Sequence, residues 1–166
     1  GTAFAKTGKL EEAETERKAL EKAIASVPET APFGGGAFAT APSVLKIAAL
    51  SLDARIAHAR GEYDRAIKFW QQAVAAADQL PYDEPPVWFY PVRESLGATL
   101  LAAGKAPEAE QVFREDLVKH PRNARALFGL QAALAKQGRD SEAILVQSEF
   151  DAAWKNADTK LTLEDF

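Results

Sequence analysis

Apolar residues recur along this chain at separations of three, four or seven, which places them on one face of an α-helix. Leu96 and Leu100 belong to one such series, and Leu127, Leu130 and Leu134 form another. Alanine and leucine dominate the hydrophobic residues, which make up 47% of the chain, whereas valine, isoleucine and threonine are sparse. That composition favours helix over sheet. The pattern therefore predicts an all-α protein.

A hexapeptide that begins with glycine and ends with alanine separates these apolar series into pairs. Its second residue is charged and the next three vary, and its copies occupy residues 8–13, 61–66, 104–109 and 138–143. The glycine can end a helix in the left-handed conformation, because it has no Cβ to clash there. The alanine falls one turn into the next helix, where two backbones must approach closely. Each copy therefore predicts a tight helix–turn–helix corner.

The apolar series and the corners together predict stacked antiparallel helix pairs, the first of them incomplete. We expect repeats over residues 1–27 (partial), 42–80, 88–121 and 122–156, followed by a tail over 157–166. The expected helices are a short one ending near residue 6, then 9–26, 42–60, 63–79, 88–103, 107–119, 122–136 and 140–156. The prediction is a single domain over residues 1–166, an α-solenoid of about 3.5–4 repeats.

The third copy resembles the tetratricopeptide repeat. The residues at that family's signature positions are Leu96, Gly97, Leu100, Gly104, Ala109, Phe113 and Pro121. The last two copies are 34 residues apart, which is the period of that repeat. The second copy has Asp53 and Ala54 where the family has Leu-Gly, and the fourth has Gln131 where the family has a small residue. The resemblance implies a right-handed superhelix and a general role in binding protein segments and assembling complexes.

Residues 82–97 and 153–158 also resemble the C-terminal region of large bacterial tetratricopeptide proteins of unassigned function. This similarity spans roughly the last half of the chain and brings no activity with it. It implies that further helical repeats precede Gly1. Because the chain begins Gly1-Thr2 and contains no methionine, we expect it to be a piece of a longer protein. The compartment, cytoplasm or periplasm, stays open.

The resemblance also implies where a partner would bind. In such repeats the first helix of each pair lines an inner groove. The corresponding positions here are Ser51, Arg55, His58, Glu94, Ala98, Leu101, Arg125, Phe128 and Ala132. Because arginine binds a carboxylate through a bidentate fork, we expect an acidic or C-terminal peptide segment as the ligand. The alternative is that these positions form an ordinary solvated face. The lysine and asparagine set with which some family members clamp a terminal carboxylate is missing, so chaperone docking of that kind is not expected.

Two connections have unusual compositions. Trp88-Phe89-Tyr90 follows two prolines. These rings either fill a wedge between helices, or Trp88 or Tyr90 anchors a partner, as aromatic residues often do in interfaces. The glycine run Gly34–Gly36 lies between two phenylalanines and is not followed by the Gly-Lys-Ser/Thr of a phosphate-binding loop. This loop either pins itself over an apolar seam or enters the groove as a lid.

Charge and composition exclude several classes of function. The net charge of −4 and the acidic pI of about 5.3 argue against a nucleic-acid surface. The basic residues Lys119, His120, Arg122 and Arg125 cluster at a predicted helix end, where the helix dipole favours cations; a phosphate or nucleic-acid site is the alternative. No segment is apolar for the roughly 18 residues that a membrane span requires, so we expect no membrane insertion.

The residues that carry catalysis or metal binding are few. The chain has no cysteine, and its two histidines, His58 and His120, are 62 residues apart. Neither has a second histidine at helical ligand spacing, so we expect no metal, no cofactor and no enzymatic activity. The leading hypothesis is a protein- or peptide-binding scaffold. One alternative is a structural subdomain of a larger enzyme or metal protein. Another is self-association as a homodimer through the N-terminal helices, where Ala13, Leu20 and Ile24 lack a full partner helix.

Overall fold

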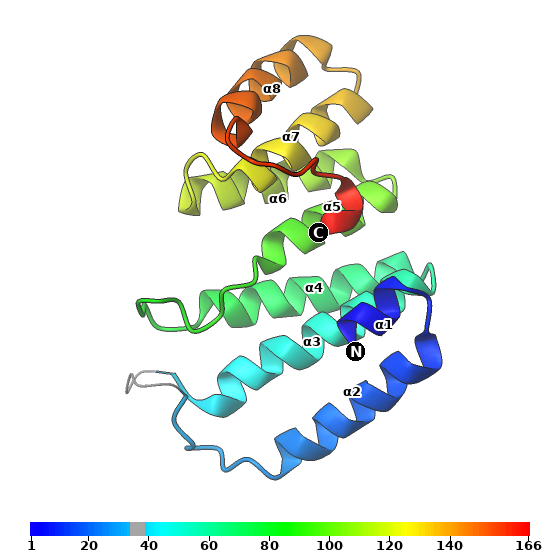
Figure 1. Cartoon of the computed structure of the whole chain (residues 1–166), viewed down its shortest axis with the longest axis vertical. Helices are drawn as coiled ribbons and strands as arrows, with labels where there is room; N and C mark the ends of the chain where they lie inside the picture. The colour runs from blue at the N-terminus through cyan, green and yellow to red at the C-terminus, as the bar shows by residue number, and fades with distance from the viewer. Residues whose placement is uncertain (34–38) are drawn as a thin grey trace. The chain divides into compact units, whose positions relative to one another are not determined.

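The computed structural model describes residues 1–33 and 39–166 of the chain (Figure 1). The helices are α1 (Thr2–Lys6), α2 (Leu10–Ala25), α3 (Ala41–Ala59), α4 (Tyr63–Asp78), α5 (Val92–Ala102), α6 (Ala106–Lys119), α7 (Ala124–Lys136) and α8 (Asp140–Trp154), followed by a 3-10 turn at Leu163–Asp165. The described residues contain no strand, and their single β-bridge joins Pro32 to Thr40. The predicted all-helical fold is confirmed.

The chain divides into two compact units, Gly1–Val92 (unit 1) and Arg93–Phe166 (unit 2). In unit 1, α1 packs on α2 and α3, α2 packs on α3, and α3 packs on α4. In unit 2, α6 packs on α7 and α7 packs on α8. These consecutive helices pack side by side as antiparallel neighbours, which is the packing of a helical repeat (Figure 1). A single domain over residues 1–166 stays a prediction.

All four hexapeptide corners form as the sequence predicts. Gly8, Gly61, Gly104 and Gly138 have φ angles of 75°, 75°, 76° and 71°, in the region that favours glycine. After each glycine, the next N–H donates to the carbonyl five residues earlier: Lys9 to Phe4, Glu62 to Ala57, Lys105 to Leu100 and Arg139 to Leu134, at 2.9–3.1 Å. This is the Schellman motif that ends a helix. The alanines of the corners, Ala13, Ala66, Ala109 and Ala143, are all buried.

Two helix starts differ from the prediction. Helix α5 begins at Val92 rather than at residue 88, because Pro91 disfavours helical geometry at the residue before it. Helix α7 begins at Ala124 rather than at residue 122, because Arg122 has a φ of 65° and leaves the helical region. Asn123 then serves as the N-cap, and its Oδ1 accepts from the backbone N–H of Arg125 at 3.1 Å.

The helices of unit 2 meet most closely around Phe113 of α6, which is fully buried. A Cβ added at Gly97 of α5 would lie 2.4 Å from the Phe113 ring, and one added at Gly129 of α7 would lie 2.2 Å from it. Both distances are too short for any side chain, so the ring requires glycine on both sides. On α8, Ile144 is exposed and does not belong to the buried face of that helix.

The predicted gap in the N-terminal pair is partly filled. Ala13 of α2 is fully buried in a cluster with Ala5 of α1 and with Leu52 and Ile56 of α3, and Leu20 packs against this cluster. The short helix α1 thus covers part of the face that we expected to be open.

Candidate functional site

The predicted groove positions of unit 1 surround Arg55 on α3. Its guanidinium carbon lies 5.5 Å from the ring centroid of Trp70 and 5.5 Å from that of Tyr90, and Nη2 donates to the Tyr90 hydroxyl. Arg55 is therefore held between two aromatic rings of its own unit. One turn along the helix, the ring of His58 meets the edge of Tyr63 at 5.2 Å. Ser51 has a buried hydroxyl oxygen without a hydrogen-bond partner among the described residues.

Burial sets the charge state of His58. Desolvation, followed by the nearby charge of Arg55, lowers the pKa of His58 below its usual value of 6.5. Its ring is therefore neutral at pH 7, and Arg55 brings the positive charge to this part of α3.

The predicted groove arginine of unit 2 has a carboxylate partner inside the fold. Arg125 Nε donates to Oε2 of Glu94 at 2.6 Å, and Glu94 is only 1% exposed. Asn123 Nδ2 donates to Glu94 Oε1 at 2.8 Å and also to Oδ2 of the buried Asp116 at 2.9 Å. His120 Nδ1 lies 3.0 Å from the other oxygen of Asp116. This network joins α5, α6 and α7 through two buried carboxylates.

The α5 positions that were expected to line a groove are buried. Glu94, Ala98 and Leu101 all lie in the interior of the fold, so none of them presents its side chain to solvent. On α7, by contrast, Arg125, Phe128 and Ala132 are each partly exposed. In unit 2 the accessible part of the predicted groove is therefore the α7 stripe.

The α7 stripe holds the end of the tail. Phe166 is only 4% exposed, and its ring lies under Arg125, whose guanidinium carbon is 4.4 Å from the ring centroid. Phe128 stacks on Phe166 at 6.1 Å and 16°, and Phe113 meets it edge-on at 6.4 Å. Arg125 Nη2 also donates to the carbonyl oxygen of Asp165 at 2.8 Å. We call Arg125, Phe128 and the edge of Phe113 the α7 seat.

The tail reaches the seat through a short, ordered path. Trp154, the last residue of α8, donates its Nε1–H to the carbonyl of Thr159 at 2.9 Å. Farther on, the carboxylate of Asp165 accepts from the backbone N–H and the hydroxyl of Thr162, at 2.7 and 2.9 Å. The bond from the Thr162 N–H is one half of a capping box, and in the other half the Asp165 N–H donates to the Thr162 hydroxyl oxygen. The Asp165 N–H also donates to the Thr162 carbonyl at 3.1 Å. The turn positions Phe166 for the seat.

Sequence reasoning missed this arrangement, although one signal was present. The tail was predicted only as a tail, and neither Phe166 nor Phe113 was placed at a site. The spacing Thr162-x-x-Asp165 is the signature of a capping box and could have indicated an ordered turn. Nothing local indicates that the turn docks on α7.

The aromatic connection between α4 and α5 is only partly buried. Phe89 is 88% exposed and Tyr82 is 82% exposed, so the prediction that all three rings of residues 88–90 fill a wedge is wrong for Phe89. Trp88 is half-buried, and its Nε1 has no hydrogen-bond partner among the described residues. Tyr90 is bound by Arg55. A role for Trp88 or Tyr90 as partner anchors stays a prediction. The loop Gly34–Gly36 lies outside the described residues.

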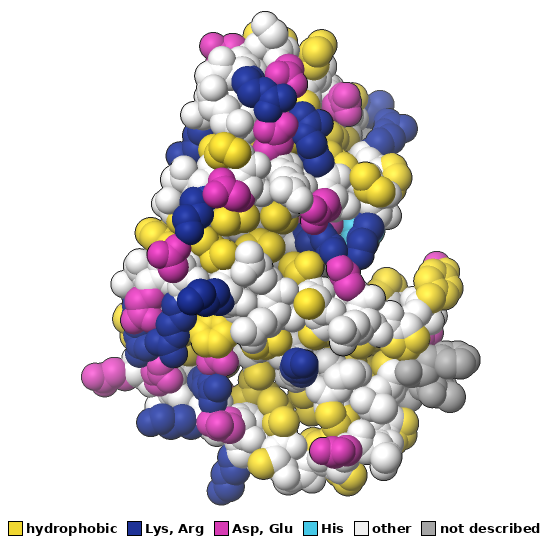
Figure 2. Space-filling model, turned by 180° about the vertical axis from the view of Figure 1, so that it is seen from behind, with side chains coloured by type: hydrophobic (Ala, Val, Ile, Leu, Met, Phe, Trp, Pro, Cys, Tyr) yellow, Lys and Arg dark blue, Asp and Glu magenta, His cyan; other side chains and the backbone are white. Residues whose placement is uncertain are grey.

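The predicted basic cluster at the end of α6 is divided among internal partners. His120 lies against Asp116, and Arg125 pairs with Glu94. On the face of the molecule drawn in Figure 2, Asp and Glu side chains lie among the Lys and Arg side chains. The described residues also contain no group of three His, Asp or Glu side chains placed to hold a metal ion. Among these same residues, no helix is both long enough and apolar enough to cross a bilayer.

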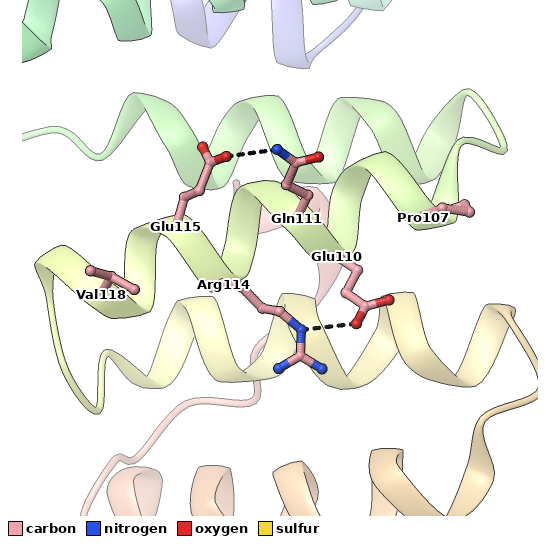
Figure 3. Close-up of a pocket in the computed structure, with 6 residues that line it drawn as sticks. All are labelled: Pro107, Glu110, Gln111, Arg114, Glu115 and Val118. Atoms are coloured by element: carbon pink, nitrogen blue, oxygen red, sulfur yellow. Dashed lines mark hydrogen bonds and ion pairs between the residues drawn. The ribbon is translucent and has the colours of Figure 1, made fainter.

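An open hollow of about 330 Å³ lies along the outer side of α6 (Figure 3). Its lining residues are Pro107, Glu110, Gln111, Arg114, Glu115 and Val118. All six come from one helix, and four of them pair with each other: Gln111 donates to Glu115 at 3.0 Å and Arg114 to Glu110 at 2.8 Å (Figure 3). The polar groups of this hollow are thus largely satisfied by neighbours on the same helix.

Consecutive helices that pack in order and turn at four equivalent glycine corners define a helical-repeat protein. Residues 49–82 match the family model described as Tetratricopeptide repeat, over most of α3, the second corner and α4. Within that stretch the chain is similar to the tetratricopeptide repeat. Neither a curated protein nor a solved structure matches the chain.

Proposed function

We propose that this chain is a module that binds segments of other proteins, and that the α7 seat is one of its binding sites. The tetratricopeptide repeat match supports a protein-interaction scaffold in general. The observation that carries the specific proposal is the placement of Phe166 under Arg125 and against Phe128. A short stretch of chain that follows a 3-10 turn already lies on this surface, through the ring of Phe166 and a hydrogen bond from Arg125 to the Asp165 carbonyl.

The contacts of Arg125 favour an aromatic ligand over an acidic one. Its Nε is already hydrogen-bonded to the buried Glu94, so the side-on fork of Nε and Nη2 is not free to hold a carboxylate of a partner. Its planar face contacts a ring, and Nη2 binds a backbone carbonyl. The proposed ligand is therefore a segment whose aromatic ring stacks on Arg125 and whose preceding residue offers its backbone carbonyl to Arg125 Nη2.

Unit 1 shows the same chemistry on α3. Arg55 lies between the rings of Trp70 and Tyr90, and Tyr90 comes from the connection that follows α4. Phe166 likewise comes from the segment that follows α8. In both units an arginine of the first helix of a pair binds an aromatic residue from the segment after the second helix. This recurrence supports an arginine-plus-ring contact as the recognition chemistry of the module.

The experiment presents a library of random peptides to the full chain carrying Phe166→Ala, which leaves the seat open. The affinity of each selected peptide is then measured for two further variants of that chain. Ala132 lies seven residues after Arg125 and four after Phe128, on the same face of the helix, so Ala132→Glu adds a charge beside them. Ala135→Glu adds the same charge at an exposed position of the same helix and is the matched control. We expect Ala132→Glu to weaken binding by about tenfold or more, which is about 1.4 kcal/mol, and Ala135→Glu to change it little.

Arg125 itself is a poor target for this test. Its removal would leave Glu94 buried without its ion-pair partner, a change that typically costs about 3–5 kcal/mol of stability. Loss of binding would then report unfolding rather than loss of the seat. A library that yields no binders, or binders that are equally insensitive to both glutamates, would contradict the proposal.

A further inference from the structure

We infer that residues 158–166 compete with partner segments for the α7 seat. The partner segments then carry the same pattern as this tail: a threonine or serine, two variable residues, an aspartate and an aromatic residue. The inference rests on the proposed function, because it needs the seat to bind segments in trans. It adds the sequence class of the partner and a means of regulating access.

The tail is held weakly compared with the helices around it. Within residues 155–166, all of which the structure describes, Phe166 alone is buried, and residues 155–160 are exposed. Its backbone is bound to α7 and α8 by hydrogen bonds that include those from Arg125 to Asp165 and from Trp154 to Thr159. Segments with few buried contacts open locally at much lower free energy than the core. The tail can therefore leave the seat without unfolding of unit 2.

The groups that the seat contacts define the pattern of the ligand. The rings of Phe128 and Phe113 and the face of Arg125 surround an aromatic ring. Arg125 Nη2 binds the backbone carbonyl of Asp165. The carboxylate of Asp165 closes the turn with Thr162. The threonine and the aspartate thus shape the segment, and the aromatic residue is inserted into the seat.

The short tether makes the tail an effective competitor. Few residues separate Trp154 from Thr159, so the tail stays near the seat at an effective concentration on the order of millimolar. A partner binds only the fraction of molecules whose seat is open, and its apparent affinity falls by that fraction. The intact chain should therefore bind such partners much more weakly than a chain whose tail cannot occupy the seat.

The test uses a fluorescent peptide of residues 157–166 and the chain of residues 1–166. Its binding is measured by fluorescence anisotropy to the intact chain, to Phe166→Ala, and to Phe166→Trp, whose larger ring should refill the seat. We expect Phe166→Ala to bind the peptide at least about tenfold more tightly than the intact chain does, and Phe166→Trp to behave like the intact chain. Phe89→Ala removes an exposed ring from unit 1 and should also behave like the intact chain.

Changes in the peptide test the pattern. A peptide with alanine in place of phenylalanine should lose binding, and one with valine in place of threonine and asparagine in place of aspartate should bind more weakly. Equal binding to the intact chain and to Phe166→Ala would show that the tail does not compete for the seat, but it would leave the proposed function standing. If the tail peptide fails to bind while library peptides still bind, the inference fails alone. If neither binds, both fail.

Amide hydrogen exchange on the intact chain gives an independent result if Phe166→Ala does not fold. The Asp165 amide, which donates to Thr162, should exchange faster than the amides of α6 and α7, because the tail opens on its own. Exchange of the Asp165 amide only at the rate of global unfolding would make the tail a fixed part of the fold and overturn the inference.

Discussion

Three residues set how closely the helices of unit 2 approach one another. Phe113 is fully buried on α6, and its ring lies against the backbones at Gly97 on α5 and Gly129 on α7. The same ring presents an edge to Phe166 in the α7 seat. The packing of Phe113 therefore connects the core of unit 2 to its proposed binding site.

A methyl group at Gly129 should destabilise the protein. Alanine is favoured over glycine in a helix by about 1 kcal/mol, but a Cβ at this position would lie 2.2 Å from the buried Phe113 ring. Overpacking of this kind typically costs about 1–3 kcal/mol, and the buried ring has little room to move. We expect Gly129→Ala to lower the free energy of unfolding, as measured by chemical denaturation.

The double variant Gly129→Ala with Phe113→Leu is the control for that prediction. It should show a favourable coupling energy, because the smaller side chain makes room for the methyl group. If Gly129→Ala stabilised the chain, as helix propensity alone would suggest, the close approach at Phe113 would be wrong.

Single residues were predictable where a local rule decides them. The four corner glycines were placed correctly because a left-handed helix end admits few other residues. The partner of Arg125 was not predictable, because Glu94 lies 31 residues away and only the packing of α5 on its neighbours brings the two together. An arginine on the inner stripe looks the same in sequence whether it binds a partner protein or a buried carboxylate.

At the scale of elements, charged side chains join the outer helices of unit 2. Glu110 of α6 accepts hydrogen bonds from Arg114 on its own helix at 2.8 Å and from Gln137 after α7 at 2.9 Å, and it also pairs with Arg139. Burial raises the pKa of Glu110, but the hydrogen bonds from Gln137 and Arg114 and the charge of Arg139 outweigh it and lower the pKa below 4.5. The hydrogen bond from Arg139 likewise lowers the pKa of Glu142.

This network predicts a loss of stability in acid. A carboxyl group whose pKa is lower in the folded state stabilises the fold above its unfolded pKa, near 4.5, and this contribution disappears as the pH falls through the lowered folded pKa. The free energy of unfolding should therefore decline below about pH 4.5. The decline should be shallower in Glu110→Gln than in the matched surface change Glu108→Gln on the same helix. Thermal denaturation across this pH range is the measurement, and equal slopes in the two variants would contradict the role of Glu110.

Helix boundaries were predictable at the corners and less so at the connections. Helices α3, α4, α6 and α8 begin within one residue of the predicted positions, since glycine, proline and threonine mark those starts. Helix α5 starts four residues late, because Pro91 acts on the residue before it. The start of α7 was missed by two residues, because nothing in the sequence around Arg122 indicates its positive φ.

At the scale of the whole molecule, the fold class and the repeat family follow from a local pattern that recurs along the chain. The return of the tail does not, because Phe166 contacts α7 across about 40 residues of chain and no periodicity encodes that contact. Of the positions predicted to line a groove in unit 2, those on α7 are partly exposed and those on α5 are buried. A segment of the same chain lies against the α7 positions.

The central claim is that a free segment can occupy the position that Phe166 occupies on Arg125. The most direct measurement is the NMR resonance of the Arg125 Nε–H group, which reports the aromatic ring stacked on its guanidinium group. In the full chain carrying Phe166→Ala this resonance should move away from its position in the intact chain. Addition of the peptide of residues 157–166 should return it to that position. A resonance that saturating peptide leaves unmoved would contradict the account.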